Sequence, residues 1–275
     1  MKRAVLVTGG NAGIGFALCR QLAAEHNCTV YMGARNAERG KLAIAKIKDA
    51  HPKADVKLTI MDVSSDESVS AAAKTLSDIK LYAVVNNAGV GLGSAASVGQ
   101  LIETNLFGPK RVTEAFVSNL DKKEGRVVNV SSGVAAMWLR DKSDAIKNMF
   151  TNADTTWDEL KSVVAKLAPT SSRGGYGISK AALNCLTLQQ AKKWPNLTIT
   201  ALTPGFINTR MTKGYGAKLT PEQGTVSMIK CLFGKVTSSH YYGSDGLRSP
   251  LTVTRDPGMP EYGGESNPDP RKYNR

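Results

Sequence analysis

The segment Thr8-Gly9-Gly10-Asn11-Ala12-Gly13-Ile14-Gly15 lies between the short apolar run Ala4–Val7 and residues with helical apolar spacing. A glycine-rich turn from a strand to a helix can present the helix N-terminus to bound phosphates. Gly9 permits the tight turn, Gly13 lets a pyrophosphate approach the backbone, and Gly15 lets the helix pack closely on the strand. The segment therefore predicts a dinucleotide-binding turn that consists of Gly9, Asn11, Ala12, Gly13, Ile14 and Gly15.

The composition is that of a globular protein with a basic surface. The 275 residues are 41% apolar and 21% charged, and the formal net charge is +13. Such a charge can indicate nucleic-acid binding, but the chain has no long Lys/Arg run and no basic stretch with interleaved aromatics. The four cysteines and three histidines show no metal-ligand spacing. We therefore expect a cytoplasmic protein with reduced thiols, no metal, no nucleic-acid partner and no membrane attachment.

Segments with strand and helix patterns alternate along most of the chain. The expected strands are short and apolar, and they lie at residues 4–7, 29–33, 56–61, 82–85, 126–130, 197–202 and 240–242. This alternation predicts an α/β fold with a Rossmann-like, doubly wound parallel sheet between two layers of helices. We expect one domain over residues 1–246. The tail 247–275 is rich in Pro, Gly and charge, and we expect it to be irregular and partly mobile.

The strict alternation is interrupted by an insertion at about 134–174. Within it, one helical face is formed by the apolar residues Trp157, Leu160, Val163, Val164 and Leu167. Thr155 and Asp158, just before this segment, resemble a capping box. A weaker helix is expected over residues 145–151.

The ends of the second, third and fourth expected strands indicate how a dinucleotide is bound. Arg35 stands where an acid would bond a ribose 2′-hydroxyl, so it favours a 2′-phosphate; a solvated loop arginine is the alternative. Asp62, followed by Val63, offers a carboxylate to an adenine amino group. The residues that follow Asn86 at the carboxyl end of the fourth strand, where open α/β sheets bind ligands, are Asn87, Ala88 and Gly89.

Two further features concern the chemistry. Tyr176 and Lys180 open a strongly helical segment at a spacing that puts both on one helix face. A nearby cation stabilises a phenolate and lowers the tyrosine pKa from about 10, which suits a proton-donating tyrosine. Asn105 interrupts an expected helix over residues 98–119, where it marks a kink with a freed carbonyl or is a surface asparagine.

Taken in order, these motifs resemble the classical short-chain dehydrogenases/reductases. The matching stretches are TGGNAGIG at 8–15, NNAG at 86–89, Asn105, Ser131-Ser132, YGISK at 176–180 and PGFINT at 204–209. The resemblance extends to about residue 246, and within the family it points to the NADPH-dependent carbonyl reductases. These share TNLFG at 104–108, GRVVNVSS at 125–132 and a long insertion before the tyrosine. The tail has no counterpart in this pattern.

The resemblance implies a role for each matching residue. Tyr176 would be the general acid/base, and Lys180 the cation that lowers its pKa and binds the nicotinamide ribose. Ser132, rather than Ser131, would hold the substrate carbonyl, and Asn105 would complete a water-mediated proton relay. Further residues of the cofactor site would be Pro204, Gly205, Ile207 and Thr209, and the substrate pocket would add Val134 and Phe206. Because Ala12 stands where many NADP-binding relatives have a basic residue, recognition of the 2′-phosphate depends on Arg35.

The predicted function is NADPH-dependent reduction of aldehyde or ketone carbonyls by hydride transfer, with tyrosine as proton donor. One alternative is an NADP-linked alcohol dehydrogenase that works in the oxidative direction, and another is a non-catalytic dinucleotide-binding sensor, which would not need the Ser–Tyr–Lys set. Val134, Trp138, Phe206 and Met211 suggest an apolar or aromatic small-molecule carbonyl substrate, or are packing residues. The apolar face at 157–167 needs a partner surface, and family members often pair through the Tyr–Lys helix; we therefore expect this segment to cover that helix and the protein to be a monomer.

Overall fold

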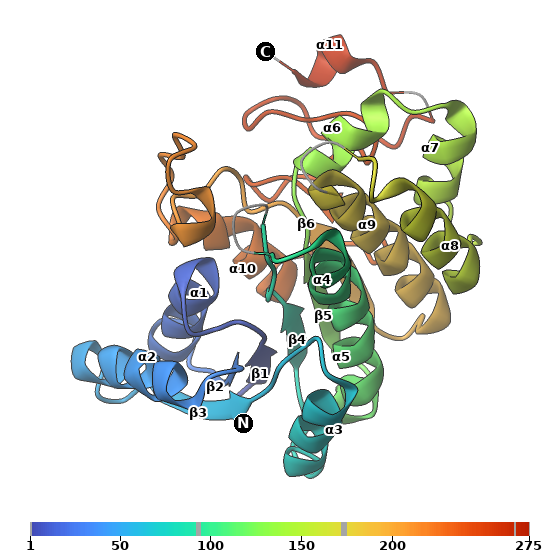
Figure 1. Ribbon diagram of the computed structural model, residues 1–275. Helices are drawn as coiled ribbons and strands as arrows, with labels where there is room; N and C mark the ends of the chain where they lie inside the picture. Colours follow the sequence, from blue (N-terminus) through green and yellow to red (C-terminus); the bar gives the residue numbers. More distant parts are fainter. Residues whose placement is uncertain (1, 92–94, 172–174, 267, 275) are drawn as a thin grey trace.

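The computed structural model describes residues 2–91, 95–171, 175–266 and 268–274 (Figure 1). They form a seven-stranded sheet in the order β3-β2-β1-β4-β5-β6-β7, and neighbouring strands are parallel throughout. The strands are β1 (Ala4–Val7), β2 (Thr29–Ala34), β3 (Asp55–Ile60), β4 (Ala83–Asn86), β5 (Arg126–Val130), β6 (Thr198–Leu202) and β7 (Tyr241–Tyr242). The predicted doubly wound fold is confirmed. Its strand order reverses between β1 and β4, which is where such sheets bind ligands.

Helices cover both faces of the sheet (Figure 1). One core packs the sheet against α1 (Gly13–Ala24), α2 (Ala37–Ala50) and α10 (Val226–Phe233). The core on the other face includes residues of α3 (Asp66–Thr75), α5 (Gly108–Phe116) and α9 (Tyr176–Lys193). Because β1 and β4 are buried on both faces, β1 and the first three residues of β4 are continuous apolar runs rather than alternating ones.

The helix expected over residues 98–119 is interrupted where Asn105 lies. It consists of α4 (Val98–Ile102), a π-helical turn (Glu103–Phe107), α5 and a final 3₁₀ turn (Val117–Asn119). Asn105 is fully buried, so the alternative of a surface asparagine is wrong. Such π-helical turns widen a helix locally and often occur at functional sites.

The described part of the insertion, residues 134–171, contains the three helices α6 (Val134–Arg140), α7 (Asp144–Thr151) and α8 (Trp157–Leu167). The apolar face of α8 is buried in a cluster with α9, as the sequence predicted. The predicted capping box is wrong by one residue. The hydroxyl that caps the N-terminus of α8 belongs to Thr156, and it accepts from the Glu159 N–H at 3.3 Å. In return, the Glu159 carboxylate accepts from the Thr156 N–H at 2.7 Å. Thr155 instead donates to the Met149 carbonyl oxygen at 2.7 Å and belongs to the preceding turn.

The tail lies along the edge strand β7. The Ser249 N–H donates to the Tyr241 carbonyl oxygen at 2.8 Å, and Arg248 pairs with Tyr242 in an antiparallel bridge. Tail backbone thus occupies the sheet edge at β7 and protects it from pairing with another chain.

The tail is largely irregular, as predicted, but it is anchored at two buried side chains. Arg255 is buried, forms an ion pair with Asp245 and donates to the Met259 carbonyl oxygen at 2.7 Å. Tyr273, in the short helix α11 (Pro270–Tyr273), is fully buried. These contacts attach the tail to the rest of the chain at two points, and the expected partial mobility stays a prediction. Among the described residues, no helix is both long and apolar enough to cross a membrane.

Candidate active site

The glycine turn leaves the N-terminus of α1 open for an anion. Gly9 and Gly13 have φ angles of 63° and 55°, in the left-handed region that favours glycine. A Cβ on Gly15 would lie 2.5 Å from the Gly9 carbonyl oxygen, so only glycine fits there. Ala12 precedes α1, no side chain in the described part of the chain caps the helix, and its first turn contains no acidic residue. The first amide groups of α1 therefore meet no side-chain acceptor among the residues that the structure describes, which fits a bound pyrophosphate.

Thr8 and Asn87 hold this turn against the end of β4. The Thr8 hydroxyl accepts from the backbone N–H groups of Asn87 and Ala88 at 3.0 and 2.9 Å. The Asn87 side chain donates to the Thr8 carbonyl oxygen at 2.8 Å. The side chain of Asn87, which the sequence assigned to cofactor binding, is thus used to shape the turn. Thr8 was not predicted as a site residue, although its position between β1 and Gly9 is a usable signal.

The adenosine end of the candidate site combines a cation and a carboxylate. Arg35 is exposed directly after β2, and it is close enough to Asp62 to act on its charge. The Asp62 carboxylate accepts from the Ser64 N–H and hydroxyl at 3.0 and 2.6 Å. Burial raises the pKa of Asp62, but these bonds and the charges of Arg35 and Arg111 outweigh it, so the pKa lies below its usual value. Asp62 is therefore an ionised acceptor.

Val63 contributes to this end only through its backbone. Its side chain is buried and packs on α5, where a Cβ on Gly108 would lie 3.0 Å from the Val63 Cγ2 atom. Its carbonyl oxygen accepts from Arg111 Nη1 at 2.7 Å.

Ser132 and Tyr176 are brought together at the carboxyl end of β5. The Ser132 side chain is close enough to the Tyr176 phenol to lower its pKa, and the Ser132 hydroxyl accepts from the Val134 N–H at 3.3 Å. Ser131, in contrast, is buried and donates to the Lys180 carbonyl oxygen at 3.0 Å. Of the two serines, Ser132 is therefore the one beside the phenol.

Lys180 is a buried cation. It is 5% exposed, and its Nζ donates to the Val130 carbonyl oxygen at 2.9 Å. Burial lowers the pKa of Lys180 to about 8, and within the described residues no carboxylate partner offsets this effect. An ammonium group has three donors, so further N–H groups remain for a ligand. Such a group fits the hydroxyl groups of a bound ribose.

The pKa of Tyr176 departs from the expectation. Burial raises the pKa, and the nearby Ser132 side chain offsets this rise only in part. Lys180 Nζ lies 5.8 Å from the centre of the Tyr176 ring. In the protein alone, loss of hydration therefore keeps the pKa of Tyr176 above its ordinary value, and the predicted lowering is absent. The phenol is protonated at neutral pH, which is the state that a proton donor requires.

Asn105 uses its whole side-chain amide to hold the loop after β4. Its Oδ1 accepts from the Val90 N–H at 2.9 Å, and its Nδ2 donates to the Val90 carbonyl oxygen at 2.9 Å and to Ser179 at 3.3 Å. A Cβ on the preceding Gly89 would lie 3.7 Å from Lys180 Nζ. Asn105 thus positions the backbone next to the buried cation.

The segment after β6 supplies the remaining predicted cofactor residues. Pro204 precedes Gly205, whose φ of 92° turns the chain. The side chain of Ile207 is buried, whereas the Thr209 methyl group would lie 3.4 Å from a Cβ on Gly13. Thr209 is therefore beside the glycine turn, while Ile207 faces the core.

The candidate substrate residues divide into two groups. Phe206 is 52% exposed, and Val134 is partly buried beside Ser132. Met211 packs on Gly91, whose Cβ would lie 3.1 Å from the Met211 sulfur. Trp138 is buried, and its ring centre lies 5.2 Å from that of Phe150, which makes it a packing residue.

Comparison with known proteins agrees with this geometry. Residues 3–142 match the family profile described as short chain dehydrogenase. The chain belongs to the short-chain dehydrogenase family. This short-chain dehydrogenase is 30% identical over 270 residues to (+)-neomenthol dehydrogenase of Arabidopsis thaliana, covering 83% of this chain and 90% of the relative.

Two further matches support the same family. Carbonyl reductase (NADPH) 1 of Mus musculus is 29% identical to this short-chain dehydrogenase over 250 residues, covering 82% of this chain and 88% of the relative. The solved structure of salutaridine reductase from Papaver somniferum superimposes with a TM-score of 0.77 at 25% identity, covering 88% of this chain and 99% of that one. The predicted family and oxidoreductase class are confirmed.

Proposed function

We propose that this short-chain dehydrogenase reduces aldehyde or ketone carbonyls with NADPH and that Tyr176 donates the proton. The observation that carries the proposal is the arrangement of Ser132, Tyr176 and Lys180. The protonated phenol of Tyr176 lies beside the Ser132 hydroxyl, and the buried Lys180 Nζ lies 5.8 Å from the centre of the Tyr176 ring. The names of the relatives, which include a carbonyl reductase (NADPH) and a neomenthol dehydrogenase, support the same reaction class.

The chain has a group for each part of NADPH. The open N-terminus of α1 would bind the pyrophosphate, and Arg35 would pair with the 2′-phosphate. Asp62 would accept from the adenine amino group, and Lys180 would donate to the nicotinamide ribose. When bound, NADPH supplies the hydride that reduces the carbonyl carbon.

Side chains of the protein would stabilise the negative charge that develops on the substrate oxygen. A carbonyl oxygen between the Ser132 hydroxyl and the Tyr176 phenol accepts two hydrogen bonds, which strengthen as the oxygen becomes negative. Tyr176 then transfers its proton to this oxygen. Lys180 stabilises the phenolate that remains, and a relay past the backbone at Asn105 would return the proton.

Three of the candidate substrate residues have apolar side chains. Val134 lies beside Ser132, Met211 packs on Gly91, and Phe206 and Met211 expose apolar surface. We therefore propose an apolar or aromatic carbonyl as substrate. Because Ser132, Tyr176 and Lys180 serve both directions, oxidation of the corresponding alcohol with NADP is the alternative.

We also propose a cytoplasmic monomer. The described cysteines are free thiols, which suits a reducing compartment. Helix α8 covers α9, and the tail covers the edge of β7, so two surfaces that would otherwise suit subunit contacts are occupied within the chain.

The experiment is to incubate the purified protein with NADPH and a panel of aromatic, aliphatic and cyclic carbonyls, and to follow NADPH absorbance. Consumption that depends on a carbonyl, together with formation of the alcohol, supports the proposal. The control omits the carbonyl. Binding of NADPH without turnover in either direction would contradict the proposal and favour the sensor alternative.

A further inference from the structure

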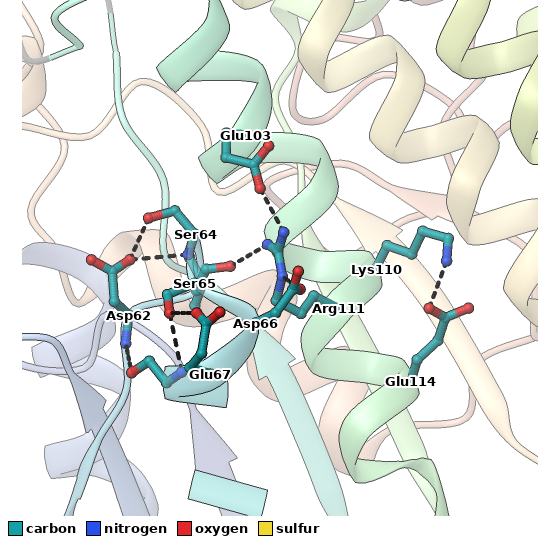
Figure 2. A network of polar contacts seen from close by, with 11 residues as sticks. Asp62, Ser64, Ser65, Asp66, Glu67, Glu103, Lys110, Arg111 and Glu114 are labelled. Atoms are coloured by element: carbon teal, nitrogen blue, oxygen red, sulfur yellow. Dashed lines mark hydrogen bonds and ion pairs between the residues drawn. The ribbon is translucent and has the colours of Figure 1, made fainter. Parts of the chain in front are cut away.

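A polar network around Arg111 of α5 joins two segments of the candidate site (Figure 2). Arg111 Nη1 donates to the Val63 carbonyl oxygen at 2.7 Å, and Nη2 donates to the Glu103 carboxylate at 2.6 Å. Its Nε donates to the Asp66 carboxylate. The Arg111 side chain is only 17% exposed, and its planar guanidinium is therefore held by contacts on three sides.

On one side, Arg111 fixes the segment assigned to adenine. Its acceptor Val63 lies between Asp62 and Ser64. The Asp62 carboxylate accepts two hydrogen bonds from Ser64, one from its backbone N–H and one from its hydroxyl. Val63 also packs on α5 at Gly108. The orientation of the Asp62 carboxylate therefore depends on how this segment is attached to α5.

On the other side, Arg111 fixes the π-helical turn. Its acceptor Glu103 is the first residue of that turn, and Asn105 lies two residues later. Asn105 holds both backbone polar groups of Val90, and the neighbouring Gly89 lies beside Lys180. A displacement of the turn would therefore reach the backbone that borders the buried cation.

We propose that Arg111 is a positioning residue that sets the adenine-binding segment and the Asn105 turn in a fixed relation. One side chain would then support both cofactor binding and proton return. The inference rests on the proposed function, because that function assigns the two segments their roles. The Asp66 carboxylate is 81% exposed and contributes little, so the contacts with Val63 and Glu103 carry the effect.

The test compares Arg111→Gln with Lys110→Gln. Lys110 is the adjacent residue on α5, and it pairs with Glu114, away from Asp66 and Glu103 (Figure 2). The first readout is the Kd of 2′-phospho-ADP-ribose, a fragment without nicotinamide, and the second is kcat at saturating NADPH. Hydrogen bonds to a charged group support an effect of about tenfold on each readout for Arg111→Gln. Lys110→Gln should leave both readouts near the wild-type values.

Two further variants keep the test informative where Arg111→Gln folds poorly. Arg111→Lys retains the positive charge but lacks the planar guanidinium with its several N–H donors, and it should give intermediate values of both readouts. Glu103→Ala breaks only the contact on the side of Asn105, so it should lower kcat and leave fragment binding unchanged.

The role of Arg111 is overturned if only the melting temperature changes, if one readout changes alone in Arg111→Gln, or if Lys110→Gln has the same effect. It is also overturned if Glu103→Ala weakens fragment binding or leaves kcat unchanged. A wild type that binds the fragment but reduces no carbonyl contradicts the proposed function instead. Loss of fragment binding in Arg111→Gln can be measured in that case as well, so the two failures are distinguishable.

Discussion

Replacing Lys180 with methionine is expected to make the protein more stable and inactive. Burial lowers the pKa of Lys180 from 10.5 to about 8. This difference means that keeping the side chain charged in the folded protein costs about 3 kcal/mol at neutral pH. Methionine removes that cost, but it leaves the Val130 carbonyl oxygen without its donor, a loss of about 1–2 kcal/mol. The net gain in the free energy of unfolding is therefore about 1–2 kcal/mol.

The gain should depend on pH in a defined direction. Below pH 8 both the folded and the unfolded wild type hold the Lys180 proton, so the full cost is present. Between about 8 and 10.5 the unfolded chain binds more protons than the folded one, and the wild type gains stability as pH rises. The advantage of Lys180→Met should therefore shrink across this window.

Urea unfolding of the cofactor-free protein measures the difference, at neutral pH and again at about pH 10. Because the other titrating groups are common to both proteins, the change in the difference isolates Lys180. The reasoning is refuted if Lys180→Met is less stable than the wild type at neutral pH, or if its advantage does not change with pH. Persistent carbonyl reduction by the variant would refute the assigned role of the lysine.

Arg35→Ala should remove most of the preference for NADPH over NADH, which we expect to be about tenfold because Arg35 is exposed; equal use of both cofactors by the wild type would contradict this. Ser132→Ala should lower kcat by about 10²-fold or more without loss of stability. Ser131→Ala should instead destabilise the fold by about 1 kcal/mol, because it breaks a buried bond to Lys180; kinetics and urea unfolding separate the two serines. Light scattering at micromolar protein should give the mass of one chain, and a stable dimer or tetramer mass would rule out the monomer.

The features that were predictable from sequence are those encoded by local residue patterns. The glycine turn follows a buried strand and opens a helix, so its residues determine its position in the sheet. Tyr176 and Lys180 share a helix face because their spacing is four residues. Several of the motifs directly follow strands, and the carboxyl ends of parallel strands lie at the same edge of the sheet. The order of the motifs therefore predicts that their residues meet at one site.

The features that were missed depend on contacts between distant segments. Thr156, three residues before Glu159, already matched the capping-box pattern better than Thr155, and in the fold Thr155 bonds to the Met149 carbonyl instead. The burial that raises the pKa of Tyr176 depends on the packing around it, which the Tyr–Lys spacing does not reveal. Arg255 looks like a solvated tail residue until Asp245 is brought beside it. The contacts of Arg111 with Val63 and Glu103 likewise become visible only in the folded chain.

The proton donor is tested by measuring Tyr176→Phe against a carbonyl that the wild type reduces well. The variant keeps the aromatic ring and loses only the hydroxyl group beside Ser132. Because a positioned acid contributes about 10²–10⁴-fold, kcat should fall by that amount while the affinity for NADPH stays nearly unchanged. A kcat within a few-fold of the wild-type value would mean that the proton comes from another group, and it would contradict the proposed mechanism.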